Sequence, residues 1–216
     1  MAQYFEVHPE NPQPRLIHQA VEILRRGGVI AYPTDSSYAL GCHIGDKAAM
    51  ERIRRIRKVG EEHNFTLVCR DLSELALYAK VSNADYRLLK HNTPGMFTFI
   101  LPASREVPRR LQNTRRKTIG LRVPDNRIVD ALLAELNEPI MSATLIPAGD
   151  RLPLNDAHEI RDRLEHELDL VIDGGPCPFE PTTVVGLKDG IPELFRQGGG
   201  DPAQLGLSPL PEDEWA

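Results

Sequence analysis

The apolar positions of the chain follow a helical period in some stretches and form short continuous runs in others, and the two patterns alternate. Between residues 13 and 26 five apolar side chains recur at helical spacing, namely Leu16, Ile17, Ala20, Val21 and Leu24. Gly27 and Gly28 follow them, so the pattern predicts an amphipathic helix that ends at the two glycines. The apolar run 29–32 comes next and stops at Pro33, which predicts a strand.

The same alternation continues to the end of the chain. Further strands are predicted over residues 65–69, 96–101, 118–123, 139–146, 169–173, 182–187 and 192–196. Further helices are predicted after a capping Asp46, over 72–78, around 86–89, over 128–136 and through Ile160 and Leu164. About eight strands and five or six helices without a repeat indicate an α/β or α+β fold around one mixed, twisted sheet. The sequence contains neither a GxGxxG after the first strand nor a P-loop, so a Rossmann or P-loop protein is not expected.

The length of 216 residues allows a substantial core. We expect a single domain over residues 1–207, although two small domains would also fit this length. The last stretch, from residue 208 to 216, is weakly patterned, and we expect a tail that is packed down or frayed.

Composition indicates an ordinary globular protein, with 41% hydrophobic and 26% charged residues. No apolar run is long enough for a membrane span, and the first residues do not form a signal peptide, so we expect a cytoplasmic protein without membrane contact. Cys42, Cys69 and Cys177 are odd in number and widely spaced, which argues against a disulfide framework or a zinc ribbon. Cys69 is expected to be a buried core thiol.

The charge of the chain is unevenly distributed. The formal net charge is −5, yet 13 of the 26 Lys and Arg residues fall in two short segments. They are Arg52, Arg54, Arg55, Arg57 and Lys58, and then Arg105, Arg109, Arg110, Arg115, Arg116, Lys117, Arg122 and Arg127. Concentrated cations on an acidic chain favour a localised site for phosphate or carboxylate, and two solvated faces are the alternative.

A cluster of short polar side chains, Thr34 to Ser37, follows the first predicted strand. Hydroxyl groups and free backbone N–H groups at a strand end can hold a small polar ligand, although an ordinary turn has the same composition. His63 follows two glutamates before a buried strand, where it could bind a carboxylate or lie in solvent.

Two arginines occur at predicted strand ends. Arg122 ends an otherwise small and apolar strand, where it would be either a snorkelling side chain or a bidentate carboxylate clamp. Arg196 precedes flexible glycines, where a backbone can approach a phosphate.

The sequence has no GxSxG, no HExxH and no EF-hand loop, so neither a catalytic triad nor a protein-held metal is expected. Mg²⁺ carried by a nucleotide remains compatible with the chain.

Several blocks, in this order, resemble the YrdC/Sua family of threonylcarbamoyl-adenylate synthases, and most closely its YciO-type branch. The blocks are YPTDSSYALG at 32–41, TPGMFTFIL at 93–101, TIGLRVPDN at 118–126, DGG at 173–175, PTTVVGL at 181–187 and FRQGG at 195–199. The resemblance spans nearly the whole chain. It implies an α/β fold with a twisted, open, mixed sheet, helices packed around it and a large, positively charged concave cavity.

The resemblance also implies a reaction and its partners. In the family, L-threonine and bicarbonate give a carbamate, which attacks the α-phosphate of ATP and releases pyrophosphate. Such chemistry depends on positioning and charge stabilisation, with Mg²⁺ arriving on ATP. Partner proteins then transfer the group to an adenosine of tRNA, and binding of tRNA or double-stranded RNA is attributed to the same fold.

Residues of the chain match the family's functional positions one by one. Thr34, His63, Arg122 and Thr144 match substrate-binding positions, and Thr182 and Arg196 match nucleotide-binding positions. Arg57 and Lys58 fall on the catalytic KxR motif, which here reads Arg57-Lys58-Val59. The SxN motif becomes Thr144 and Ile146, so one cation and one amide are missing.

These departures leave two hypotheses. Losing a charged contact and an amide contact, at about 1.5–3 kcal/mol each, would lower activity roughly 10²- to 10⁴-fold. One hypothesis is a weakly active nucleotidyltransferase of the L-threonylcarbamoyladenylate synthase type. The alternative is a non-catalytic double-stranded RNA- or tRNA-binding protein on the same fold. Its RNA contacts would be Arg52, Arg55, Arg109, Arg110, Arg115, Arg116 and Lys117.

Overall fold

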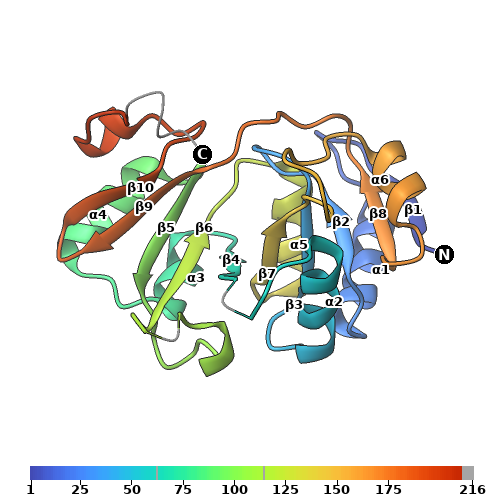
Figure 1. Cartoon of the computed structure of the whole chain (residues 1–216), viewed down its shortest axis with the longest axis horizontal. Helices are drawn as coiled ribbons and strands as arrows, with labels where there is room; N and C mark the ends of the chain where they lie inside the picture. The colour runs from blue at the N-terminus through green and yellow to red at the C-terminus, as the bar shows by residue number, and fades with distance from the viewer. Residues whose placement is uncertain (62, 114, 211–216) are drawn as a thin grey trace. The chain divides into compact units, whose positions relative to one another are not determined.

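The computed structural model describes residues 1–61, 63–113 and 115–210, and for Arg110 the backbone alone. Its α-helices are α1 (Pro14–Arg25), α2 (Lys47–Arg57), α3 (Leu72–Tyr78), α4 (Asn83–Asn92), α5 (Arg127–Leu136) and α6 (Ala157–Leu164), with 3-10 turns at Arg109–Leu111 and Pro202–Leu205. Its strands are β1 (Gln3–Glu6), β2 (Ile30–Tyr32), β3 (Ala39–His43), β4 (Thr66–Val68), β5 (Phe97–Pro102), β6 (Thr118–Arg122), β7 (Ile140–Thr144), β8 (Leu170–Asp173), β9 (Thr183–Lys188) and β10 (Ile191–Arg196). The predicted mixed α/β class with an open sheet is confirmed (Figure 1).

Two compact units divide the chain, and each is described by itself. The first unit comprises residues 1–63 and 126–179, and the second comprises residues 64–125 and the segment from Glu180 onward. One domain over residues 1–207 stays a prediction. Of the predicted tail, residues 211–216 lie outside the described residues.

The first unit contains a mixed sheet with the strand order β1-β8-β2-β3-β7. β8 runs parallel to both β1 and β2, whereas β3 runs antiparallel to β2 and β7. Helices α1 and α5 pack against each other, and their apolar stripes are buried. This sheet and its helices hold the turn after β2 and the turn after β8 close together.

The helix boundaries of the first unit follow from capping residues. Asp46 caps α2 by accepting a hydrogen bond from the Ala49 N–H at 2.9 Å, as predicted. Helix α1 starts at Pro14 and is followed by Gly27, whose φ of +83° suits glycine. The sequence patterns therefore located these ends within a residue or two.

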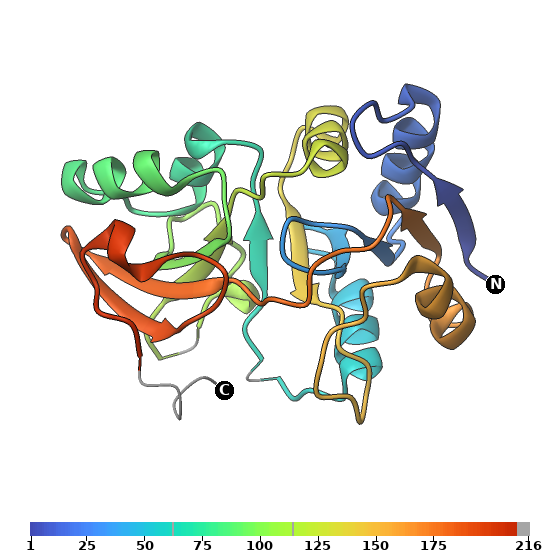
Figure 2. The same cartoon turned by 90° about the horizontal axis from the view of Figure 1, so that it is seen from above.

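The second unit contains a mixed sheet with the order β4-β6-β5-β9-β10. Helices α3 and α4 lie on one side of it. Helix α4 lies behind β9 and β10 in Figure 1 and beside them in Figure 2. Alternate residues of β5, namely Phe97, Phe99 and Leu101, are buried in the core, while Thr98 and Ile100 point to the opposite face.

The edge strand β10 contains a β-bulge. Leu194 pairs with Val185, and Arg196 pairs with Val184, so Phe195 and Arg196 together oppose one residue of β9. The extra residue changes the alternation of side chains along β10. Arg196 thereby shares a face with Val184, whereas strict alternation would turn it the other way.

Strand β1 was missed by the sequence patterns. Its four residues are only partly buried, and its partner β8 lies far away in the sequence, so no local signal marks it.

Cys69 is fully buried, as predicted, and Cys42 and Cys177 are buried too. Among the described residues, no helix is long and apolar enough to cross a membrane.

Candidate functional site

The turn after β2 is organised by the Thr34 hydroxyl. This oxygen donates to the Ser37 carbonyl at 2.6 Å and accepts the N–H groups of Ser36 and Ser37 at 3.1 and 3.2 Å. Thr34 is 3% exposed. The hydroxyl is thus engaged within its own turn, as in other Ser/Thr turns. A ligand at this turn would meet its backbone and neighbouring side chains before it met the Thr34 oxygen.

A second turn, from Asp173 to Cys177, lies against the Thr34 turn. The Tyr38 hydroxyl donates to the Gly175 carbonyl at 2.9 Å and accepts the Gly174 N–H at 3.4 Å. The Thr34 backbone N–H is hydrogen-bonded to the Cys177 thiol. Burial raises the pKa of the Cys177 thiol to about 11, and this hydrogen bond offsets part of the rise. The thiol is therefore protonated near neutral pH.

Helix α2 ends at the candidate catalytic segment. Lys58 has φ +53°, and its N–H and that of Val59 donate to the carbonyls of Arg55 and Arg54, which closes the helix. Glycine is the usual residue in this left-handed conformation, and a lysine there carries a conformational cost. Lys58 is exposed, and Arg57 and Val59 are partly buried. The strained residue is therefore the one whose charge is available to a ligand.

Arg57 and His63 contact each other. The Arg57 Nη1 lies 2.5 Å from the His63 Nε2, so we assign Nε2 as the acceptor and place the imidazole proton on Nδ1. Burial lowers the pKa of the Arg57 guanidinium. Within the described part of the chain, the buried Nε of Arg57 has no hydrogen-bond partner. A half-buried cation with a neutral neighbour is suited to an anionic ligand.

The loop after β7 is fixed beside the end of α2. The Ala148 N–H donates to the Ile56 carbonyl at 3.0 Å, and the Leu145 N–H donates to the Tyr38 carbonyl at 3.0 Å. Thr144 and Ile146, the two SxN positions, flank Leu145 and are both partly buried. The first unit thus gathers Thr34, the Arg57–His63 pair and Thr144 around one set of neighbouring loops.

In the second unit, the side chains opposite α3 and α4 form what we call the arginine face. It includes Thr66, Val68, Thr98, Ile100, Gly120, Arg122, Val184, Gly186, Glu193, Phe195 and Arg196. Arg122 lies two residues beyond Gly120, which pairs with Ile100, and Thr98 pairs with Val184. Arg196, Val184, Thr98 and Arg122 therefore form one row across four strands.

Thr182 anchors the Arg196 end of this row. The Arg196 Nη2 donates to the Thr182 carbonyl at 2.8 Å, and the hydroxyls of Thr182 and Thr98 are 2.8 Å apart. Burial lowers the pKa of Arg196, and the positive charge of Arg122 lowers it further. Arg122 is 8% exposed. Two neighbouring guanidinium groups that repel each other are stabilised by an anion placed between them.

The next row of the arginine face has Ile100 between two glycines, with Glu193 at its β10 end. Ile100 pairs with Gly120 on one side and with Gly186 on the other. A Cβ on Gly186 would lie 2.8 Å from the Phe195 ring, and one on Gly120 would lie 3.1 Å from the Thr66 hydroxyl. The two glycines therefore let neighbouring side chains lie close over the strands, and Ile100 and the Phe195 ring form what we call the apolar floor beside the arginine row.

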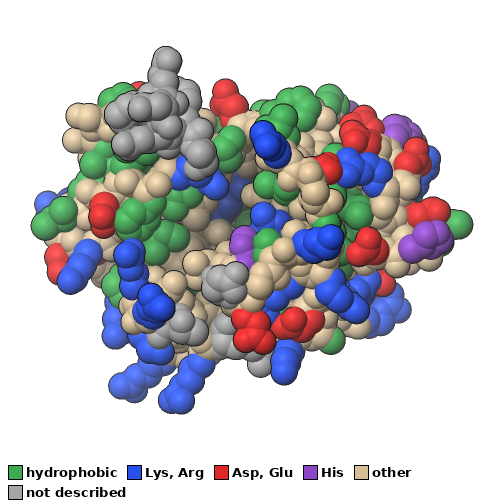
Figure 3. Space-filling model, viewed as in Figure 1, with side chains coloured by type: hydrophobic (Ala, Val, Ile, Leu, Met, Phe, Trp, Pro, Cys, Tyr) green, Lys and Arg blue, Asp and Glu red, His purple; other side chains and the backbone are tan. Residues whose placement is uncertain are grey.

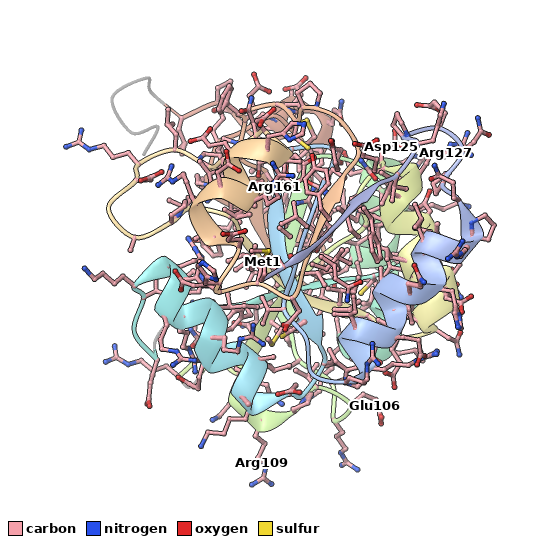
Figure 4. All side chains as sticks on the ribbon, turned by 90° about the vertical axis from the view of Figure 1, so that its right-hand side faces the viewer. Met1, Glu106, Arg109, Asp125, Arg127 and Arg161 are labelled. Atoms are coloured by element: carbon pink, nitrogen blue, oxygen red, sulfur yellow. The ribbon has the colours of Figure 1, made fainter. Side chains whose placement is uncertain are left out.

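The predicted RNA contacts differ in their surroundings. Arg109, Arg115, Arg116 and Lys117 are exposed, and Figure 4 shows Arg109 extending away from the ribbon. Lys and Arg side chains also project at the lower left of Figure 3. Arg116 lies 5.8 Å from the centre of the Phe195 ring. The side chain of Arg110 lies outside the described residues.

The two remaining predicted contacts lie on α2. Arg52 binds the Asp169 carboxylate at 2.8 Å and the Glu167 carbonyl at 2.9 Å, which gives it a structural partner. Arg55 is exposed. All seven RNA contacts stay predictions, and so does the large, positively charged concave cavity.

Sequence reasoning missed several residues of these sites. Tyr38, Thr98 and Phe195 were not singled out, although a lone threonine in the apolar run 96–101 is a signal that could have pointed to Thr98. Tyr38 and Gly175 meet across 137 residues of sequence, so no local pattern marks their contact. Within the described residues, no group of three or more His, Cys, Asp or Glu is placed to hold a metal ion.

Comparisons with known proteins place the chain in a family. The family model of the Sua5/yciO/yrdC domain, described as "Telomere recombination", matches residues 22–198. The uncharacterized protein YciO of Escherichia coli (strain K12) is 58% identical over 201 residues, which cover 93% of this chain and 98% of that protein. The crystal structure of E. coli YciO matches with a TM-score of 0.91 and covers 95% of this chain and 100% of the other. The chain belongs to the Sua5/YciO/YrdC family, in its YciO-type branch.

Two further members of the Sua5/YciO/YrdC family have informative names. A threonylcarbamoyl-AMP synthase of Nitrosococcus oceani is 33% identical over 159 residues, which cover 73% of this chain and 85% of that enzyme. The crystal structure of P. abyssi Sua5 complexed with L-threonine matches with a TM-score of 0.83 at 26% identity and covers 91% of this chain and 57% of the other. The chain is thus related to threonylcarbamoyl-AMP synthases.

Proposed function

We propose that the protein binds ATP and L-threonine and makes threonylcarbamoyl-AMP slowly, in the route that modifies tRNA adenosine to threonylcarbamoyladenosine. The observation that carries this proposal is the row of Arg122, Thr98 and Arg196, with Thr182 at its end. Two guanidinium groups beside paired threonine hydroxyls suit the phosphate groups of ATP. The L-threonine complex of P. abyssi Sua5 supports the amino acid as a substrate.

The proposed reaction has two steps. The threonine amine combines with bicarbonate to form a carbamate, with loss of water and formation of a C–N bond. A carbamate oxygen then attacks the α-phosphorus of ATP, the bond to the β-phosphate breaks, and pyrophosphate leaves. In the second unit, Arg122 and Arg196 would hold phosphate groups of ATP. In the first unit, Arg57 and Lys58 offer their positive charges to a phosphate group.

The apolar floor supports a place for the nucleotide base. Two residues along a strand span about 6.7 Å, which is comparable with the separation between the 5′-phosphate and the base of a nucleotide. A base lying on Ile100 and Phe195 would therefore place its phosphate at Arg196. Mg²⁺ would arrive on the phosphates of ATP, because the residues proposed for them are cationic or neutral and provide no carboxylate ligand.

Pyrophosphate release tests the proposal. We expect slow, threonine-dependent release when concentrated protein is incubated with ATP, Mg²⁺, bicarbonate and L-threonine, because Val59 and Ile146 remove two contacts that active relatives have. Arg196→Gln should abolish it, and the matched control Arg87→Gln, an exposed residue of α4, should not. Release that is equal with and without L-threonine would contradict the proposal.

Titration with tripolyphosphate and ATP tests the floor. If the base contributes to binding, the protein binds ATP more tightly than tripolyphosphate. Phe195→Ala then lowers the affinity for ATP and leaves the affinity for tripolyphosphate unchanged. Equal affinities for the two ligands would remove the floor from the proposal and leave the phosphate contacts.

A non-catalytic double-stranded RNA- or tRNA-binding protein is the second candidate. The exposed cations Arg109, Arg115, Arg116 and Lys117 favour it. Affinity for tRNA should then fall steeply with salt, and Arg109→Gln with Arg115→Gln should make that dependence shallower. Binding that does not saturate at low salt would contradict this candidate. In either case partner proteins of tRNA modification would act together with the protein.

A further inference from the structure

The Thr34 turn and the Asp173–Cys177 turn are joined by one buried hydroxyl group. Tyr38 is fully buried, and its hydroxyl joins the two turns through the Gly175 carbonyl and the Gly174 N–H. Burial raises the pKa of the Tyr38 hydroxyl, so this group remains a hydrogen-bond donor throughout the physiological pH range.

Three further contacts hold the second turn in the same place. A Cβ on Gly174 would meet the Ile128 Cδ1 and would lie 2.9 Å from the Pro33 Cγ, so this backbone packs directly on the residue that follows β2. The thiol of Cys177 is hydrogen-bonded to the Thr34 backbone. The Gly175 N–H donates to the Asp173 Oδ1 at 2.9 Å.

The outer end of this arrangement is also braced. The Tyr4 hydroxyl of strand β1 donates to the Asp173 Oδ2 at 2.6 Å. An unbroken series of hydrogen bonds therefore runs from Tyr4 through Asp173 and Gly175 to Tyr38. Networks of this kind fix backbone positions more firmly than single bonds do.

Gly175 presents bare backbone to open space. Its φ is +90°, and no atom lies within 4 Å of the position that a Cβ would take. Glycine is thus required there by conformation, and the space above it is free. Because the Thr34 hydroxyl faces inward, the backbone of the two turns is the part that a small ligand would meet.

We propose that Tyr38 is a positioning residue that holds the Gly174–Gly175 backbone against the Thr34 turn, so that the two turns together bind the small amino acid substrate. This inference rests on the proposed function, because the amino acid is L-threonine. Without the Tyr38 oxygen, the Gly175 carbonyl and the Gly174 N–H lose their shared partner, and the second turn moves away from Thr34.

Tyr38→Phe tests the inference, and Tyr32→Phe is its matched control. Tyr32 is also fully buried, but its hydroxyl is hydrogen-bonded to the Ser142 Oγ at 2.7 Å. We expect Tyr38→Phe to weaken L-threonine binding roughly tenfold by calorimetry, while Tyr32→Phe stays within about twofold of the wild type. Melting temperatures of both variants separate this loss from a general loss of stability.

A thiol reagent gives a second readout that does not depend on the substrate. Cys177 is buried under the joined turns, so its reaction with the reagent should be at least roughly ten times faster in Tyr38→Phe and unchanged in Tyr32→Phe. A Cys177→Ser background identifies the reacting thiol. Should Tyr38→Phe fail to fold, Gly175→Ala displaces the same turn, since its methyl group enters open space while the backbone conformation is disfavoured.

The outcomes are distinct. Equal threonine affinity and equal thiol reactivity in the two phenylalanine variants would overturn the positioning role. If the wild type binds no L-threonine, the proposed function fails, and the thiol reaction then decides the inference. A faster reaction in Tyr38→Phe alone supports the positioning of the second turn by Tyr38, and equal rates overturn it.

Discussion

Arg196 and Arg122 stand in the same cross-strand row, and the positive charge of Arg122 adds to burial in lowering the pKa of Arg196. Like charges on one face repel each other, and an anion bound between them would offset that repulsion. The bonds from Arg196 to the Thr182 carbonyl hold it in place against that repulsion. This arrangement is the one on which the proposed phosphate contact rests.

Replacing Arg196 should therefore weaken nucleotide binding more than it weakens the fold. Arg196→Gln removes a charged contact worth about 1.5–3 kcal/mol, which corresponds to roughly 10- to 150-fold in Kd for ATP. Arg87→Gln on α4 should leave Kd unchanged. Calorimetric titration with ATP and Mg²⁺ measures both, and an unchanged Kd in Arg196→Gln would show that the row does not hold the phosphate.

Replacing Lys58 by glycine should move stability and binding in opposite directions. Glycine relieves the left-handed conformation of Lys58 and should stabilise the fold by about 1 kcal/mol, while the loss of the charge weakens ATP binding. The control is Asn137→Gly, which lies at the left-handed end of α5 with φ +57°. It should gain less stability, because asparagine tolerates this conformation, and should bind ATP as the wild type does. Urea unfolding measures the stability, and titration measures the affinity for ATP. A loss of stability in Lys58→Gly, or an unchanged affinity for ATP, would contradict this prediction.

The Thr34 hydroxyl should contribute to stability through its turn. Thr34→Val leaves two N–H groups and the Ser37 carbonyl without their partner, and we expect a loss of about 1–3 kcal/mol in the free energy of unfolding. Thr34→Ser retains the oxygen and should lose much less. Both are measured by urea denaturation, and equal losses in the two variants would assign the effect to the methyl group.

Packing at Gly174 should appear as a coupling between two residues. Gly174→Ala places a methyl group against the Ile128 Cδ1 and should destabilise the fold by about 1–3 kcal/mol. Ile128→Val removes that atom and should recover part of the loss. A double-mutant cycle from urea unfolding tests this, and strictly additive losses would show that the two groups do not meet.

Stability at alkaline pH should depend on Cys177. Its pKa is raised from the ordinary value of 9.0 to about 11, so the unfolded chain loses this proton at lower pH than the folded protein does. The stability that the buried neutral thiol contributes is present below pH 9 and is lost as pH rises toward about 11. Its size is on the order of 2–3 kcal/mol. The unfolding free energy of Cys177→Ala should therefore fall less steeply than that of the wild type between about pH 8.5 and about pH 10.5. Identical slopes of unfolding free energy against pH in the two proteins would exclude this contribution.

The sequence patterns predicted the local structure well where the signal is local. The Asp46 cap and the apolar stripes of α1 and α5 lie within single helices, and capping and periodicity act there. Strand β1 could not be predicted in this way, because it is stabilised by parallel pairing with β8, more than 160 residues away. Local patterns do not record such pairings.

The candidate site was predicted in its residue types but not in its contacts. Thr34, Arg122 and Arg196 were identified from the turn, the strand ends and the family resemblance. The inward direction of the Thr34 hydroxyl and the bond from Tyr38 to Gly175 depend on how distant segments pack. Arg122 and Arg196 lie on the same face of the sheet because one extra residue is inserted into β10. Strict alternation of side chains along β10 would place Arg196 on the opposite face.

The bulge in β10 also affects how the protein behaves among other proteins. β10 is an edge strand, and a regular edge offers unpaired backbone groups to any strand that approaches it. Here Pro192 has no N–H to offer, Glu193 is exposed and charged, and the bulge at Phe195 interrupts the ladder. The irregularity that aims Arg196 thus also discourages edge-to-edge aggregation in a crowded cell.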